Sequence, residues 1–314
     1  MTDLKSINPD EKCAPGKKFE NNSCLTLNAL QKIAEAFNKE NGDKIPTHVN
    51  KEKLVDILDD KMEKKYKCTE QTCWTRQKFL EELDDKVLED IQDRTFRPKG
   101  PSEKYGWLST TNINEVIDQY HNIYKDFTFL GAVPYDFQEL KQLEIHNLDF
   151  AKLEKEGKNK IGLVINLDKH YDNGSHWVAL YSDLKNNQIY FFDSVGRPPR
   201  TLIRKFINKI TKYMYQKKYN KKLPINDVIK DLKNYKNIDN KTKKYTHITN
   251  LLGGNFDIKY NKKQHQIKDS ECGVYAINFI TRLAGGDTFE NVSNNIMHDD
   301  IMNRNRAIYF RNVN

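Results

Sequence analysis

The spacing of apolar residues predicts a helical first third of the chain. Residues 23–40 carry apolar side chains at intervals of three and four, the spacing of one helix face: Leu27, Leu30, Ile33 and Phe37. Thr26 or Ser23 is available to cap this helix. Residues 50–66 repeat the pattern, and we predict a third helix over residues 75–89.

The pattern changes after residues 97–101, where Pro and Gly interrupt both helix and strand. We therefore predict a helical N-terminal arm domain over residues 1–100 and a second domain over residues 101–314. The second domain mixes helices with short apolar runs typical of buried strands. Its predicted strands are residues 161–167, 176–181, 188–193 and 256–260, and its predicted helices are residues 111–124, 202–215, 272–283 and 296–310. A central sheet flanked by helices in this way is an α+β fold.

Charged residues make up 31% of the chain and aromatic residues 11%, a mixture typical of a globular protein rather than a disordered one. No apolar run approaches the roughly 20 residues that a membrane-spanning helix needs. The N-terminus also lacks the apolar stretch of a signal peptide. We therefore expect no membrane partner, and a protein that stays inside a cell or in a particle assembled there.

The net charge of +8 is concentrated in one stretch of the chain. Residues 200–263 hold 18 Lys and Arg against 4 Asp, a balance of +14. A solvated, Lys-rich surface explains this most simply. The alternative is weak binding of DNA or of an acidic partner through these residues.

Cys272 stands apart from the four other cysteines, which all lie in the predicted arm. It begins a predicted apolar helix, and a helix N-terminus and a nearby histidine are the two common ways to activate a cysteine thiolate. Taken alone, a buried structural cysteine is the simpler interpretation. His176 weakens that interpretation, because it opens a predicted strand after a turn-prone loop, at a rigid position from which it can act as base.

Two further residues complete a candidate catalytic set. Asp193 ends the next strand of the same predicted hairpin, so its carboxylate can orient the imidazole of His176. Gln266 precedes Cys272 by six residues, and its amide can donate to an oxyanion together with the Cys272 backbone N–H.

Over residues 105–314 the chain resembles the Ulp1/SENP and adenovirus-protease clan of cysteine peptidases. The resemblance rests on four segments in this order: His176-Trp177, Asp193-Ser194, Gln266, and Cys272-Gly273. Residues 107–110 (WLST), followed by a helix, also resemble the entry segment of the SUMO proteases. The resemblance implies an Ulp1-like peptidase that uses no metal and no organic cofactor.

The same resemblance implies how substrate is bound. In SUMO proteases, tryptophans at the positions matching Trp107 and Trp177 form a narrow tunnel over the scissile bond. We therefore expect both to bind substrate, and two glycines before the cut to pass between them. A purely structural role for Trp177 in the core is the alternative.

Within the clan, the chain is most similar to the polyprotein-processing proteases of large cytoplasmic DNA viruses, including African swine fever virus and giant viruses. The swine fever enzyme also carries a helical N-terminal arm, and it has Asn where this chain has Asp193. The resemblance implies cleavage after Gly-Gly in a viral structural polyprotein during particle maturation, in the virion and host cytoplasm. One alternative is a deconjugase for SUMO- or ubiquitin-like proteins, and another is a basic scaffold that has lost catalysis.

Several residues remain open at this point. Cys13, Cys24, Cys68 and Cys73 are compatible with zinc binding, with two disulfides or with buried thiols, although their spacing is unusual for zinc. His170 and His265 lie near the candidate site in sequence, and we interpret both as surface or supporting residues.

Overall fold

The computed structural model describes residues 12–219 and 256–311, and it divides into two compact units. One unit holds residues 12–102 together with residues 306–311, and the other holds the described part of residues 103–305. The end of the chain from Arg306 onward is therefore part of the first unit, although the sequence pattern assigns it to the second domain. Most of the basic stretch, residues 220–255, lies outside the described residues.

The first unit is helical, as the sequence predicts. The Thr26 side chain accepts a hydrogen bond from the Ala29 N–H and caps the first helix, and Asn50 caps the second by accepting from the Lys53 N–H. Both helices contribute buried apolar residues to a core that also contains Trp74. The elements are α1 (Leu27–Glu40), α2 (Lys51–Tyr66), α3 (Gln71–Trp74), η1 (Lys78–Leu80) and α4 (Asp85–Gln92).

The third helix predicted over residues 75–89 is wrong, because the chain there forms separate short pieces. Asp84 has an extended backbone, and its side chain accepts from the Lys86 N–H, so it starts a new helix rather than continuing one. Ahead of it, Gln77 turns inward, where its amide lies 3.2 Å from the sulfur of Cys68 and 3.4 Å from that of Cys73. The Asp84 cap and the contacts of Gln77 with the two sulfur atoms therefore prevent the continuous helix that the apolar spacing predicted.

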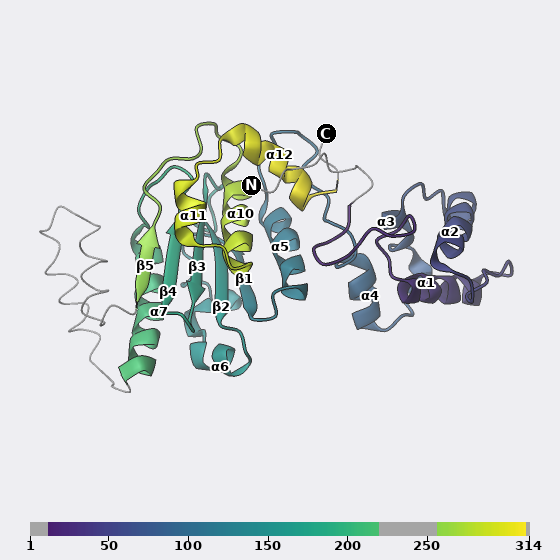
Figure 1. Ribbon diagram of the computed structural model, residues 1–314, viewed down its shortest axis with the longest axis horizontal. Coiled ribbons are helices and arrows are strands. Elements are labelled where there is room, and N and C mark those ends of the chain that lie inside the picture. Colours follow the sequence, from purple (N-terminus) through teal and green to yellow (C-terminus); the bar gives the residue numbers. More distant parts are fainter. Residues whose placement is uncertain (1–11, 220–255, 312–314) are drawn as a thin grey trace, which may run out of the picture. The chain divides into compact units, whose positions relative to one another are not determined.

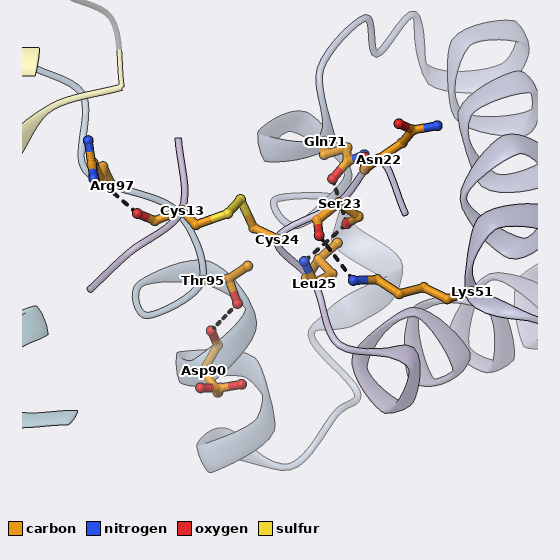
Figure 2. The surroundings of a disulfide bond; sticks show 10 residues. All are labelled: Cys13, Asn22, Ser23, Cys24, Leu25, Lys51, Gln71, Asp90, Thr95 and Arg97. Carbon is orange, nitrogen blue, oxygen red and sulfur yellow. Dashed lines mark hydrogen bonds between the residues drawn. A yellow bond between two sulfur atoms is a disulfide. The ribbon is translucent and has the colours of Figure 1, made fainter. Parts of the chain in front are cut away.

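The four arm cysteines form two disulfides, Cys13–Cys24 and Cys68–Cys73. Figure 2 shows the first of these, which fastens the segment before α1. On one side, the Arg97 Nε donates to the Cys13 carbonyl oxygen at 3.1 Å. On the other side, the Lys51 ammonium donates to the Ser23 carbonyl oxygen at 3.0 Å. The disulfide alternative is therefore the one that this structure adopts.

The second unit is built on a mixed five-stranded sheet in the order β1-β2-β3-β4-β5, which confirms the α+β prediction (Figure 1). The outer pairs β1–β2 and β4–β5 are parallel, and the two inner pairs are antiparallel. The strands are β1 (Phe127–Val133), β2 (Lys160–Asn166), β3 (Trp177–Asp183), β4 (Gln188–Phe192) and β5 (Asp257–Tyr260). Its helices are α5 (Thr110–Asp118), α6 (Phe150–Lys155), α7 (Thr201–Tyr219), α10 (Cys272–Ala284) and α11 (Phe289–Asn294), with η2 (Gln119–Asn122), η3 (Lys141–Leu143) and η4 (Ile145–Asn147) between them. The last helix, α12 (Asp299–Tyr309), begins in this unit, and its residues from Arg306 belong to the first unit.

Alternate side chains of the strands build a core on each face of the sheet. Leu163, Val178 and Phe191 belong to a cluster that includes the buried face of α7. Their neighbours point the other way, toward α10, where the ring of Phe192 stacks on Phe279 at 4.9 Å between centroids. Figure 1 shows α10 and α11 lying over the sheet. Because both faces are covered, the central strands consist of continuous apolar runs, which is why the sequence located them.

The edge strand β1 and the short helices α6 and α11 were not predicted. The pairing of β1 with β2 shifts between Phe129 and Ala132, where Gly131 has a φ of +103°. This irregularity breaks the alternation that would mark a strand in the sequence. Helices of six residues, such as α6 and α11, are too short to establish a period of 3.6.

Candidate active site

The hairpin β3–β4 brings two of the candidate residues together. His176 immediately precedes β3, and Asp193 immediately follows β4. In this hairpin Ala179 pairs with Phe192, so both residues lie at the same end. The Nε2 of His176 is 2.7 Å from the Oδ1 of Asp193, and the Asp193 side chain is buried.

The carboxylate of Asp193 is held in place by its surroundings. Its Oδ1 also accepts from the Val195 N–H at 2.9 Å. The buried side-chain amide of Asn261 makes two hydrogen bonds to the backbone of Asp193. It accepts from the Asp193 N–H at 2.8 Å and donates to the Asp193 carbonyl oxygen at 2.6 Å. Asn261 was missed by the sequence analysis, because one asparagine in a Lys-rich stretch gives no signal of its own.

Cys272 is a free thiol at the first position of α10, close enough to His176 to act on the pKa of its imidazole. Burial alone would lower the pKa of His176, but its hydrogen bonds with Asp193 and Cys272 outweigh burial and raise the pKa to about 9. An imidazolium and a helix N-terminus both stabilise a thiolate. The structure therefore brings Cys272, His176 and Asp193 close together.

Gly273 allows a close contact behind the nucleophile. A Cβ added at this position would lie 3.0 Å from the Cβ of Leu108. The Leu108 carbonyl in turn accepts a hydrogen bond from the indole Nε1 of Trp177 at 2.9 Å. The sequence analysis did not identify Leu108, which joins the wall around Trp177 to the start of α10.

Gln266 is buried and oriented by two hydrogen bonds. Its Oε1 accepts from the Ser194 hydroxyl at 2.6 Å, and its Nε2 donates to the Lys268 carbonyl. An amide nitrogen carries two N–H groups, so one remains to donate to an oxyanion. The backbone N–H groups of His265 and Gln266 both donate to the Ser194 carbonyl, at 2.7 and 2.9 Å. Gln266 is thus anchored to the residue that follows Asp193.

Asp299, another residue that the sequence analysis missed, holds the loop after Gln266. Its Oδ2 accepts from the backbone N–H groups of Ile267 and Lys268, both at 2.9 Å. Its Oδ1 lies 3.3 Å from the hydroxyl of Tyr275, which belongs to α10. This buried carboxylate therefore joins the loop of Gln266 to the helix that begins with Cys272.

A cleft of about 580 Å³ is lined by both Trp107 and Trp177, and Trp177 directly follows His176 in the chain. The four candidate catalytic residues themselves do not line this cleft. Trp107 is 52% exposed, whereas Trp177 is 7% exposed and packs largely as a core residue. Apolar side chains and a loop with several charged residues also contribute to the lining, among them Leu140, Leu143, Asp168, Lys169, His170 and Asp172.

The two histidines set aside in the sequence analysis lie in different environments. His265 is buried, its Nε2 is 3.1 Å from the Ser293 carbonyl oxygen, and burial holds its pKa below the ordinary value. His170 lines the cleft. Among residues 12–219 and 256–311 the structure shows no group of three or more metal-ligating side chains. Within the same residues no helix is long and apolar enough to cross a membrane.

Comparisons with known proteins give a consistent result. Residues 158–313 match the model of the Ulp1 protease family, C-terminal catalytic domain. The chain is 32% identical to a putative thiol protease of Acanthamoeba polyphaga mimivirus, over 96% of this chain and 93% of that protein. It is also 23% identical to a cysteine protease of African swine fever virus (isolate Tick/Malawi/Lil 20-1/1983), over 69% and 72% of the two chains. The relative from the Pig/Kenya/KEN-50/1950 isolate is named a SUMO-1 cysteine protease and is 22% identical over the same shares.

Solved structures show the same fold. The crystal structure of an African swine fever virus protease superposes with a TM-score of 0.58 at 19% identity, covering 96% of both chains.

Proposed function

Because the chain belongs to the Ulp1 family of cysteine proteases, we propose that it is an endopeptidase acting through Cys272, His176, Asp193 and Gln266. The observation that carries this proposal is the position of His176, which is hydrogen bonded to Asp193 and lies close enough to Cys272 for the two side chains to interact. Labelling with a thiol-reactive active-site probe tests it directly. Failure of the probe to modify Cys272 would leave the scaffold that has lost catalysis as the better explanation.

The proposed reaction depends on which nitrogen of the His176 ring is hydrogen bonded to Asp193. The Nε2 of His176 is bonded to Asp193, so Nδ1 remains to exchange a proton with Cys272. The thiolate attacks the peptide carbonyl carbon, and the imidazolium then gives its proton to the leaving amine. His176 next takes a proton from water, and the resulting hydroxide attacks the acyl-enzyme carbonyl. The thiolate leaves, which restores the thiolate–imidazolium pair, and the new carboxylic acid loses its proton to solvent.

Gln266 stabilises the charge that develops on the carbonyl oxygen. The backbone N–H of Cys272, at the start of α10, is the second donor. The Lys268 carbonyl fixes which end of the Gln266 amide is nitrogen, because a carbonyl oxygen only accepts, and the Ser194 hydroxyl then donates to the amide oxygen at 2.6 Å. Donors positioned before the reaction need no reorganisation as the charge appears.

The proposed specificity is for glycine at both positions before the cut. The cleft passes Trp107 and Trp177, and flat indole walls leave little room for a side chain. Glycine has no Cβ, so two in succession let an extended backbone pass. Peptides that contain Gly-Gly-X, Ala-Gly-X or Gly-Ala-X, with the expected cut before X, test this specificity. Efficient cleavage of the two alanine peptides would rule out the requirement for glycine.

We further propose that the substrate is a viral structural polyprotein, cut in the virion and host cytoplasm during particle maturation. The support is the similarity along nearly the whole chain to a giant-virus thiol protease. A deconjugase for SUMO- or ubiquitin-like proteins is the second candidate, because the Kenyan swine fever relative is named a SUMO-1 cysteine protease. Incubation with candidate polyproteins and with SUMO conjugates, read by mass spectrometry, separates the two.

Weak binding of DNA or of an acidic partner through residues 200–263 remains a separate proposal, supported only by the +14 balance of that stretch. Some of its described cations are engaged within the fold. Arg200 donates to the Leu167 carbonyl at 3.0 Å, and Lys209 donates to the His146 carbonyl at 2.8 Å. Electrostatic binding weakens steeply with salt. Absence of DNA retention at low ionic strength would leave the solvated surface as the explanation.

A further inference from the structure

The residue before the nucleophile carries a buried carboxylate that no step of the proposed reaction uses. Glu271 is 1% exposed and occupies the N-cap position of α10. Among the described residues, its side chain makes none of the hydrogen bonds that would cap this helix. Instead, its Oε1 accepts from the Asn303 side-chain amide and from the Ser270 hydroxyl, both at 3.1 Å. The carboxylate is therefore bonded to α12 rather than to the end of α10.

Asn303 is the α12 residue in this contact, and its amide is fully engaged. It is 7% exposed, and its Nδ2 donates to Glu271 and also to the Lys104 carbonyl oxygen at 3.0 Å. An amide nitrogen carries two N–H groups, so both are used. An ionised carboxylate and a carbonyl only accept, so they also fix which end of the amide is nitrogen. Rotation of the Asn303 side chain would therefore break both hydrogen bonds.

Glu271 determines where one donor of the proposed reaction lies. Its carbonyl group and the Cys272 N–H belong to one planar peptide group. The carbonyl oxygen accepts from the Tyr275 N–H at 2.9 Å, in the first turn of α10. In a trans peptide the N–H points opposite to the carbonyl, so the Cys272 N–H is directed away from the helix and remains for an oxyanion. A shift of Glu271 therefore moves this donor.

The charge of Glu271 does not explain its place beside the nucleophile. A negative charge next to a thiolate opposes formation of that thiolate. His176 and the start of α10 are the features that favour the thiolate of Cys272. The hydrogen bonds of Glu271 to Ser270 and Asn303 are therefore the property that can aid the reaction.

A second residue of α12 holds the other oxyanion donor. Asp299 lies four residues before Asn303, so the two side chains share one face of the helix. Asp299 accepts from the backbone N–H groups of the two residues that follow Gln266. One face of α12 thus bonds both segments that supply an oxyanion donor, the loop of Gln266 and the start of α10.

We propose that α12 sets the distance between the two oxyanion donors, and that Glu271 and Asn303 are positioning residues for the Cys272 N–H. The proposal rests on the proposed function, because it needs the reaction at Cys272 and the donor role of Gln266. Asp299 holds one donor and Asn303 the other, and the regular rise of the helix keeps their separation constant. The developing charge then meets two donors that need no rearrangement.

The test compares turnover with alkylation of the nucleophile. Turnover needs the oxyanion donors, whereas iodoacetamide needs only the thiolate, and the other four cysteines are paired in disulfides. The substrate is whichever of the proposed peptides, polyproteins and SUMO conjugates the native enzyme cuts best. Asn303→Ala and Glu271→Ala should each lower kcat roughly 10- to 100-fold. KM and the rate of alkylation at Cys272 should change little.

Conservative and neighbouring variants separate positioning from folding. Glu271→Gln keeps an oxygen that accepts from Asn303, so it should retain most of the native kcat. Asp300→Ala changes an exposed carboxylate of α12 that pairs with the Lys268 ammonium at 3.1 Å, and it should behave as native. Because Glu271 and Asn303 act through one bond, the double alanine variant should lose little more than the weaker single variant.

Several results would overturn the proposal. Native kcat in both alanine variants would mean that this contact does not position the donor. Equal falls in kcat and in the alkylation rate would mean that the contact only supports the fold. The same loss in Glu271→Gln as in Glu271→Ala would mean that charge matters instead. If the native enzyme is not alkylated at Cys272, or cuts no substrate, the proposed function itself fails, and the positioning role fails with it.

Discussion

The two units of this protein use cysteine in opposite ways. In the unit of residues 12–102, four cysteines are paired in two disulfides that close short loops around a small helical core. In the unit of residues 103–305, the single cysteine is free, and a covered sheet with buried polar groups holds the structure. A small helical core gains much from cross-links, whereas the sheet unit has enough buried surface to position a reactive thiol without them.

The largest expected effect comes from the free thiol. Cys272→Ala should abolish turnover, because it removes the nucleophile, while the thermal unfolding transition stays close to native since little volume is lost. Cleavage of a Gly-Gly peptide and a melting curve measure the two properties. Measurable turnover in this variant would mean that Cys272 is structural, as the arm cysteines are.

Removal of the oxyanion donor should have the next largest effect. Gln266→Ala should lower kcat about 10²- to 10³-fold, the usual loss for one such donor. A Ser194→Ala control removes only the hydroxyl that orients the amide, so its loss should be smaller. Native activity in the Gln266 variant would contradict the assignment of this residue.

The carboxylate partner of His176 should affect both the rate and the pH profile. Asp193→Ala should lower kcat on the order of 10²-fold, and Asp193→Asn less, because an amide oxygen still accepts from the imidazole. The raised pKa of His176 keeps the imidazolium protonated up to about pH 9, so activity should fall as pH rises through that value. Both variants lack the negative charge of Asp193, which helps to raise the pKa of His176. The pH at which activity falls on the alkaline side should therefore be lower in both variants. Identical pH profiles in native and variant enzymes would show that Asp193 does not act on the imidazole.

Asp299 allows a test of positioning rather than chemistry. Asp299→Ala frees the backbone of residues 267 and 268, so kcat should fall roughly 10-fold, with KM little changed, as the Gln266 loop loses its anchor. Asp299→Asn should restore most of the rate, because both N–H groups bond the same oxygen and an amide oxygen can replace it. Equal losses in the two variants would mean that charge, not the loop anchor, matters.

The smallest effect on catalysis should come from the arm disulfides. Replacing both Cys13 and Cys24 by Ser should lower the free energy of unfolding of the first unit by about 2–4 kcal/mol, and the shorter Cys68–Cys73 loop should contribute less. Probe labelling at Cys272 should stay native in both double variants. Denaturant unfolding of the whole chain, followed at Trp74, measures the first effect. Loss of labelling would mean that the two units depend on each other for stability.

The sequence could predict the parts of the site that lie at the ends of regular elements. His176 and Asp193 flank strands whose apolar runs are unmistakable, and Cys272 opens an apolar helix. Asn261 and Asp299 could not be found this way. Each makes two hydrogen bonds to backbone groups far away in sequence, and such bonds leave no period or composition bias behind.

The arm was predicted less well for a related reason. Its first two helices have capping residues at the expected positions, but the third was predicted from apolar spacing alone. Asp84 and the turned-in amide of Gln77 divide that region, and neither effect is visible in a hydrophobic pattern. The pairing of the four cysteines likewise depended on distances that spacing does not supply.

The contact between Gly273 and Leu108 has a consequence for how such enzymes can diverge. Leu108 rests on the helix that carries the nucleophile, and its carbonyl also holds the indole of Trp177. Leu108 therefore links the position of the Trp177 indole to the position of the helix that begins with Cys272. A methyl group added at residue 273 would push against Leu108 and would therefore disturb both the Trp177 indole and the start of α10. Under the proposed Gly-Gly specificity, a substitution that widens the space beside Trp177 would also shift the start of α10, so specificity and catalysis would change together.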